Sequence, residues 1–333
     1  MSSLIEPAET PVGVAWNRVA LYYGIAFGLA CLLGVGLWLA GANLVSGAAT
    51  PILQWTLAFF YMPLPIVAAL IVEKRAGHGY LLGVEKRTIG RNIGRVAVVS
   101  FAVGIAVYLA NLGVTLVLGN LLGIGGVGTL VATQAEVLQA ITESMPAAAT
   151  QANLANTPPV TLLYVLGPLV GIIAGFTING LFAFGEEYGW RGVLMDELKP
   201  LGPVRANLLT GVMWGLWHAP VIALGFNYGA VRGWGILMMC AVMTPLSFIL
   251  WRARAYSRSV AAPAIIHGAF NGFAGFFLFL TIGRSTLVAV PVGAAGALAL
   301  TVVAVVVWRV FKPAPALEPA RGRSAAPLEL AAE

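Results

Sequence analysis

Long uninterrupted runs of apolar residues dominate this chain, and the polar residues gather in short segments between them. A helix needs about 20 predominantly apolar residues to cross a bilayer. The runs lack the alternation of apolar and polar residues that the strands of a membrane-spanning barrel would show. They therefore predict an all-α, polytopic integral membrane protein. We expect about eight transmembrane helices: Val19–Ala40, Ile52–Val72, Val96–Leu122, a fourth beginning near Leu162, Ala206–Leu224, Trp234–Trp251, Val260–Ile282 and Leu287–Trp308.

The composition agrees with this reading and excludes other classes of protein. Of the 333 residues, 59% are hydrophobic and only 10% are charged, and the mean hydropathy is +0.88. A soluble domain carries about 25% charged residues, so a soluble globular enzyme and a disordered chain are both excluded. Cys31 and Cys240 form no motif, and no disulfide framework is indicated. The single aspartate, Asp196, excludes any mechanism that needs two aspartates.

The positions of the basic residues predict the orientation in the membrane. Of the 19 Lys and Arg residues, all but Arg232 and Arg284 fall on one side of the predicted spans. Basic residues favour the cytoplasmic side, so both termini are expected in the cytoplasm, and we predict a bacterial inner (plasma) membrane protein. The net charge of +6 then reports orientation in the lipid bilayer, and no nucleic-acid partner is expected.

Composition also divides the chain into segments. Residues 123–159 contain no Lys or Arg and predict a long extracytoplasmic loop, in which Thr133–Ser144 has the composition of a short helix. A repeated Ala and Pro pattern near the C-terminus is typical of a disordered tail. The predicted organisation is a cytoplasmic N-terminal segment (1–18), helices one to three with the long loop (19–158), a second membrane domain with helices four to eight (159–310) and a cytoplasmic tail (311–333).

Two adjacent glutamates near the end of the fourth run are the first candidate chemistry. Ionisable residues inside a bilayer are costly and need a reason. We extend the fourth helix to Lys199, where Pro200 ends it. Glu187 and Arg191 are then spaced for an ion pair one helical turn apart, which leaves Glu186 without a local partner and able to act as a base. A purely structural ion-pair cluster is the alternative.

The remaining polar residues lie in two other spans. His218 follows Trp214 by four residues, and His267 precedes Asn271 by four, so each pair lies on one face of its helix. A hydrogen-bonded core histidine and a helix–helix hydrogen bond are the structural alternatives. Counting about 1.5 Å of rise per residue from the cytoplasmic helix ends places Glu186, His218 and Asn271 roughly 20 Å deep and His267 about 13 Å deep. Such agreement predicts an intramembrane catalytic cavity with water activation beside an oxyanion site.

These motifs resemble the CPBP family, which comprises type II CAAX prenyl proteases and bacteriocin-processing enzymes and is also called the Abi family. The family pattern is Glu-Glu-x-x-x-Arg, then aromatic-x-x-x-His, then His-x-x-x-Asn. It is matched here by Glu186, Glu187, Arg191, Trp214, His218, His267 and Asn271. Tryptophan at 214 departs from the more usual phenylalanine. The resemblance covers about Leu162 to Ile282.

The resemblance implies an intramembrane endopeptidase in which Glu186 and His218 activate water. It implies that His267 and Asn271 stabilise the oxyanion, while Glu187, Arg191 and Trp214 support the site. Glu186, His218 and His267 are also chemically suitable zinc ligands, but a glutamate and a histidine can activate water without metal, and we favour the mechanism that needs no cofactor.

The expected partner is a membrane-anchored peptide or protein substrate, and the sequence leaves open whether it is prenylated. A transporter or proton relay is the competing class, although the sequence shows no inverted repeat and no interrupted helix pair. A non-catalytic immunity or scaffold protein on the same fold is the third possibility.

Overall fold

The computed structural model describes residues 13–44, 51–77, 80–144 and 154–314. Its α-helices are α1 (Trp16–Leu39), α2 (Pro51–Thr56), α3 (Leu64–Ala76), α4 (Leu81–Val114), α5 (Gln134–Ser144), α7 (Val160–Phe176), α8 (Ile178–Glu187), α9 (Met195–Leu198), α10 (Gly202–Trp217), α11 (Ala219–Ala223), α12 (Arg232–Ser257), α13 (Ala261–Leu280) and α14 (Ala294–Val310). Single π- or 3₁₀-helical turns join or extend several of them: η1 (Leu57–Tyr61), η2 (Thr115–Leu121), η3 (Leu154–Asn156), η4 (Tyr188–Leu194) and η5 (Lys199–Leu201).

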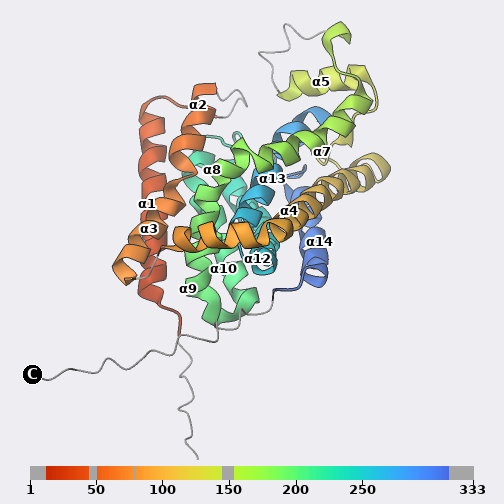
Figure 1. Ribbon diagram of the computed structural model, residues 1–333. Coiled ribbons are helices and arrows are strands. Elements are labelled where there is room, and N and C mark those ends of the chain that lie inside the picture. The colour runs from red at the N-terminus through yellow and green to blue at the C-terminus, as the bar shows by residue number, and fades with distance from the viewer. Residues whose placement is uncertain (1–12, 45–50, 78–79, 145–153, 315–333) are drawn as a thin grey trace, which may run out of the picture.

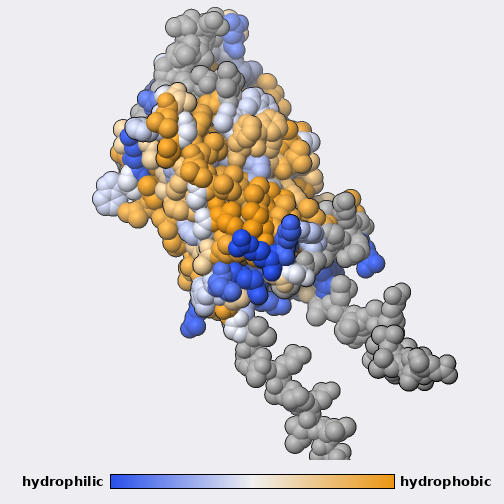
Figure 2. All heavy atoms as spheres, turned by 90° about the vertical axis from the view of Figure 1, so that its left-hand side faces the viewer, coloured by the Kyte–Doolittle hydropathy of each residue, from blue (hydrophilic) through white to orange (hydrophobic). Residues whose placement is uncertain are grey.

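The chain forms an all-α, polytopic membrane protein, as predicted. In the described residues, five helical segments are long and apolar enough to cross a bilayer, and a bent pair gives up to one more. The five coincide with the predicted first, second, third, sixth and seventh spans. Figure 2 shows the face that contains α1 and α3, where a broad hydrophobic surface has hydrophilic residues along its lower edge. Many large apolar side chains are exposed on these helices, as expected for contact with lipid.

The fourth and eighth predicted spans differ from the structure. The expected continuous helix from Leu162 to Lys199 is broken at Thr177, where the backbone leaves the helical region and the flanking segments meet at 55°. The predicted continuity of the fourth helix is therefore wrong, while one break is not the interrupted pair of helices typical of transporters. The eighth run contributes only α14, because residues 283–293 form turns that fold back on the chain, with the Ser285 amide donating to the Gly126 carbonyl.

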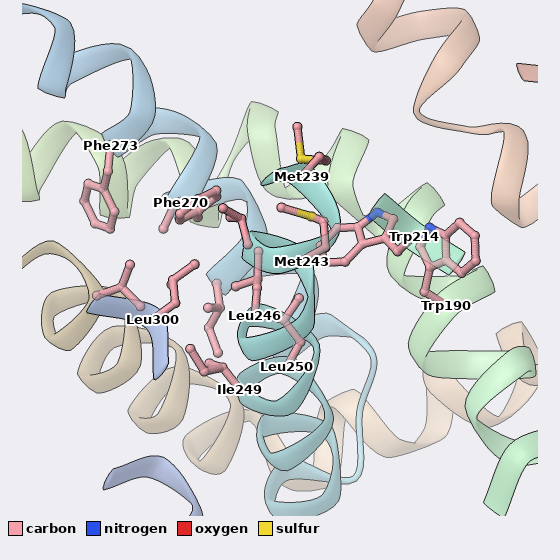
Figure 3. Packing of buried hydrophobic residues seen from close by; sticks show 14 of the residues in the cluster. Trp190, Trp214, Met239, Met243, Leu246, Ile249, Leu250, Phe270, Phe273 and Leu300 are labelled. Atoms are coloured by element: carbon pink, nitrogen blue, oxygen red, sulfur yellow. The ribbon is translucent and has the colours of Figure 1, made fainter. Parts of the chain in front are cut away.

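Helix α12 lies in the middle of the bundle, against α10, α13 and α14. Figure 3 shows Met239 and Met243 of this helix between Trp214 on one side and Phe270 on the other. Helix α13 approaches α8 closely enough that a Cβ on Gly268 would lie 2.5 Å from the Gly180 amide nitrogen. Glycine here lets the two backbones approach closely, which brings the polar residues of α8 and α13 together.

The long loop carries the short helix that the sequence predicts, α5. Its first turn is capped by Glu136, which accepts hydrogen bonds from the Ala132 and Thr133 amides at 2.7 and 2.9 Å, and these bonds lower the Glu136 pKa. Strand β1 (Thr129–Leu130) pairs antiparallel with β2 (Thr281–Ile282) at the end of α13. The loop is thereby fixed to the helix that carries His267 and Asn271 (Figure 1).

Helix α4 begins fifteen residues before the predicted third span. Its Glu85 is buried and reaches the start of α13, where it accepts hydrogen bonds from the Ser259 hydroxyl and the Val260 amide at 2.7 and 2.9 Å. The basic region before the third span is thus partly helical. Most of the predicted N-terminal segment 1–18 and of the predicted tail 311–333 lies outside the described residues, so those predictions stand as made.

Candidate active site

Glu187 connects two helices of the predicted site. It is fully buried, and its Oε1 accepts hydrogen bonds from Arg191 Nη1 at 3.0 Å and from His267 Nδ1 at 2.9 Å. The predicted ion pair between Glu187 and Arg191 is therefore confirmed. The contact with His267 joins α8 to α13. Glu187 Oε2 and Arg191 Nε and Nη2 make no hydrogen bond within the described part of the chain.

Glu186 points to a different helix. Its Oε2 accepts a hydrogen bond from Trp214 Nε1 at 2.9 Å, so the partner missing from its own helix comes from α10. The Trp214 ring also faces Arg191, whose guanidinium carbon lies 4.0 Å from a ring centroid, and it meets the His267 ring edge-on at 5.2 Å. One buried indole therefore contacts Glu186, Arg191 and His267, which come from α8, η4 and α13.

His218 lies at the junction of α10 and α11 and is half-buried. Its Nδ1 is 2.8 Å from the Trp214 carbonyl oxygen. A carbonyl oxygen only accepts, so Nδ1 carries the proton, and in the neutral ring Nε2 keeps a free lone pair. The hydrogen bonding thus leaves His218 with a nitrogen that can accept a proton.

Asn271 is the one predicted site residue that the structure leaves apart from the cluster. It is exposed and has no hydrogen bond to another described residue. It lies one turn along α13 from the buried His267, so the two residues share a face that runs from the closed cluster to an open surface.

The sequence analysis missed residues from the first half of the chain that enclose the site. Tyr22 of α1 is buried and packs edge-on against Trp190, with ring centroids 5.4 Å apart. A Cβ on Gly189 would clash with the Tyr22 hydroxyl and would lie 2.7 Å from Pro65 Cβ, so glycine lets the motif helix approach α1 and α3. Tyr22 and Pro65 carry no sequence signal, because each is one apolar or aromatic residue within a long apolar run.

Local backbone geometry also shapes the site. The segment directly after the two glutamates, Tyr188–Leu194, is a π-helical turn, a feature found often at functional sites. Tyr188 donates a hydrogen bond to Glu73 Oε2 at 2.8 Å, and Glu73 Oε1 accepts from the Leu81 amide. The motif helix is therefore held to the connection between α3 and α4 by a buried glutamate that sequence motifs did not identify.

The predicted zinc alternative needs three ligands that lie close together. Among the residues that the structure describes, no group of three or more His, Cys, Asp and Glu side chains is arranged to hold a metal ion. The described side chains of Glu186, His218 and His267 are therefore not gathered into such a ligand set. The hydrogen bonds of the two histidines through Nδ1 leave both Nε2 atoms free, and catalysis without a metal stays a prediction.

This arrangement defines a class: a helical membrane protein with a buried glutamate–histidine site built from three helices. Residues 162–273 match the family model described as type II CAAX prenyl endopeptidase, Rce1-like. CAAX prenyl protease 2 of Methanococcus maripaludis is 27% identical over 138 residues, which cover 34% of this chain and 51% of that protein. The chain thus matches about half the length of this curated relative.

These matches confirm the resemblance to the CPBP family of CAAX prenyl proteases within residues 162–273. The matched segment contains every residue of the predicted site. At the level of the family, the matches support a membrane-embedded protease.

Proposed function

We propose that this protein is an intramembrane endopeptidase that hydrolyses a peptide bond in a membrane-anchored peptide or protein. The observation that carries the proposal is the buried network in which Glu187 contacts His267 and Glu186 contacts Trp214. Independent structural hydrogen bonds on three helices have no need to converge on one site. Their convergence in residues 162–273, where the family match lies, supports a catalytic purpose.

In this proposal, Glu186 and His218 activate the attacking water. Glu186 uses one oxygen for Trp214 and keeps the other, and His218 keeps the lone pair of Nε2. A water held between these two acceptors loses a proton as it attacks the scissile carbonyl carbon. The proton then passes to the leaving amine as the carbon–nitrogen bond breaks.

In this proposal, His267 and Asn271 stabilise the developing oxyanion. Glu187 accepts from His267 Nδ1 and orients the ring, so Nε2 is the nitrogen that faces the oxyanion, as a donor when both ring nitrogens carry a proton. The amide of Asn271 supplies a second donor from the same helical face. Arg191 and Trp214 hold Glu187 and Glu186 in place and do not themselves touch the substrate.

The proposed membrane is a bacterial inner membrane, with both termini in the cytoplasm. This orientation rests on the distribution of basic residues, of which only Arg232 and Arg284 lie on the opposite side. A cytoplasmic opening then gives access to the tails of membrane-anchored proteins.

The deciding experiment is peptide cleavage by the purified protein, comparing wild type with Glu186→Gln. Glu197→Gln is the matched control, because Glu197 lies three turns further along the same helical segment and pairs with Arg18, outside the proposed site. We expect Glu186→Gln to fold and to lose cleavage, and Glu197→Gln to retain it. Folded, fully active Glu186→Gln would refute the mechanism. Comparing the cleavage of prenylated, acylated and unmodified peptides identifies the preferred substrate. Repeating the assay with a metal chelator tests whether cleavage depends on a metal.

A proton-coupled carrier remains the alternative because of one observation, the helix break at Thr177. Discontinuous helices line the binding sites of many transporters, where they occur as pairs in two repeats. Proton uptake into proteoliposomes that depends on Glu186, in a protein without peptidase activity, would favour this alternative. A folded protein with neither activity would favour the non-catalytic scaffold.

A further inference from the structure

The buried residues Glu186, Glu187, Arg191, Trp214 and His267 form the polar cluster of the proposed site. A separate cavity opens beside α1. Its volume is about 690 Å³, within the range typical of small-molecule sites. Helix α1 contributes Phe27, Cys31, Val35 and Trp38, and the opposite wall comes from α11 and the residue after it. None of the residues proposed for catalysis lines it.

The residues of α1 that line the cavity extend over about the thickness of one membrane leaflet. From Phe27 to Trp38 the helix rises roughly 16 Å at 1.5 Å per residue. The hydrocarbon core of a bilayer is about 30 Å thick, so this length corresponds to about half of it. The lining is mainly apolar, so a single hydrocarbon chain fits its chemistry.

The rim of the cavity has the features of a membrane interface. Trp38, which lines the cavity, is 66% exposed, and tryptophan is enriched where the hydrocarbon meets the headgroups. Arg232 also lines the cavity and is the first residue of α12. It is one of only two basic residues on the side predicted to be extracytoplasmic.

Arg232 has no hydrogen bond or ion pair with any other residue of the described ranges, and it is exposed. The start of a 26-residue helix adds free backbone amides and the positive end of the helix dipole beside it. An unpaired cation at such a position is complementary to a phosphate. The apolar cavity and this charge together describe an amphiphile with an anionic head.

We propose that this cavity binds an anionic glycerophospholipid of the extracytoplasmic leaflet. One acyl chain lies along α1 between Phe27 and Trp38, and the phosphate pairs with Arg232 at the start of α12. The bound lipid fills the space between α1 and α11, directly beyond the junction that carries His218. The proposal stands on this cavity and does not depend on the peptidase activity.

Cys31 lines the cavity and supplies a direct probe of occupancy. The purified full-length protein is alkylated with a maleimide in detergent with added phosphatidylglycerol or phosphatidylcholine, and both cysteines are quantified by mass spectrometry. We expect phosphatidylglycerol to slow labelling of Cys31 about fivefold more than phosphatidylcholine, the ratio that corresponds to ~1 kcal/mol for one basic residue at an anionic surface. Cys240, which does not line the cavity, is the internal control.

Two variants distinguish recognition of the lipid headgroup from binding of the acyl chain. Arg232→Ala removes the preference for phosphatidylglycerol, whereas Arg205→Ala, at an exposed arginine in the first turns of α10, retains it. Ala223→Trp fills the cavity and removes protection by both lipids. Native mass spectrometry counts retained phosphatidylglycerol in each folded variant and gives a second readout.

Equal protection by the two lipids, or an unchanged preference in Arg232→Ala, would overturn the proposal. Retention of phosphatidylglycerol by folded Ala223→Trp would place the lipid elsewhere and would overturn it as well. Glu186→Gln keeps the lipid-dependent protection of Cys31 whether or not it cleaves peptides. Failure of the lipid proposal is therefore distinguishable from failure of the proposed function.

Discussion

The substitution Glu187→Gln tests how much the buried charge of Glu187 contributes to folding stability. It keeps the size of the side chain and removes the negative charge that faces two donors, Arg191 and His267. Arg191 is 1% exposed, so water cannot replace the lost charge. The guanidinium would keep only its contact with the face of Trp214.

The expected loss of folding stability in Glu187→Gln follows from the burial of Arg191. Breaking a buried ion pair by removing one partner destabilises a protein by about 3–5 kcal/mol, because the remaining charge is left uncompensated. The interaction between Arg191 and the Trp214 ring is present in the wild type and in the variant, so it does not offset this loss. The hydrogen bond to His267 can survive through the amide oxygen of glutamine, but it loses its charge assistance. We therefore expect a loss within that range.

Reversible unfolding in mixed detergent micelles measures this loss for Glu187→Gln and for the double variant Glu187→Gln with Arg191→Met. Arg191→Met removes the guanidinium that Glu187→Gln leaves without a counter-charge, so the double variant should recover part of the stability. Cleavage falls in both variants, because His267 no longer faces a carboxylate. If the single variant is as stable as wild type, Arg191 is not confined to a dry interior, and the account of the cluster is wrong.

Further predictions concern other contacts. Trp214→Phe keeps the aromatic ring and removes the donor to Glu186, so it should cost about 1.5–3 kcal/mol in unfolding assays and lower the cleavage rate. Gly189→Ala forces a Cβ against α1 and α3 and should cost about 1–3 kcal/mol or more, whereas Gly94→Ala, with open space around its Cβ position, should not destabilise. The lowered pKa of Glu136 means that its contribution to α5 is complete above the ordinary glutamate pKa and disappears as the pH falls through the folded-state value. Hydrogen exchange of α5 amides at decreasing pH, with Glu136→Gln as the variant already lacking the charge, measures this. Reporter fusions should be extracytoplasmic after α1 and cytoplasmic after α14.

Hydropathy predicted the fold class because bilayer thickness imposes one length on every span. The bounds of α13 and α5 agree with their predicted ranges within two residues at each end. The break at Thr177 was not predicted, because the residues on both sides are equally apolar. Backbone direction there depends on packing: a Cβ on Gly175 would lie 2.8 Å from the Ala269 amide nitrogen, in the facing helix.

The spacing of residues predicted which side chains share a helical face, and so it predicted the pair of Glu187 and Arg191 correctly. It could not predict contacts between helices. The hydrogen bond from Trp214 to Glu186 and the one between His267 and Glu187 depend on how α8, α10 and α13 cross. Equal depth in the membrane made convergence plausible, but depth does not specify which of two adjacent glutamates meets which partner.

The observed contacts explain how two adjacent glutamates can have different roles. Neighbouring residues on a helix point about 100° apart, so Glu187 meets α13 and Glu186 meets α10. Trp214 then acts on both members of the proposed water-activating pair. Its indole N–H binds Glu186, while its backbone carbonyl accepts from His218 Nδ1. Phenylalanine at this position would preserve the second contact but not the first. In this chain, a single tryptophan therefore couples the orientation of the carboxylate to that of the imidazole.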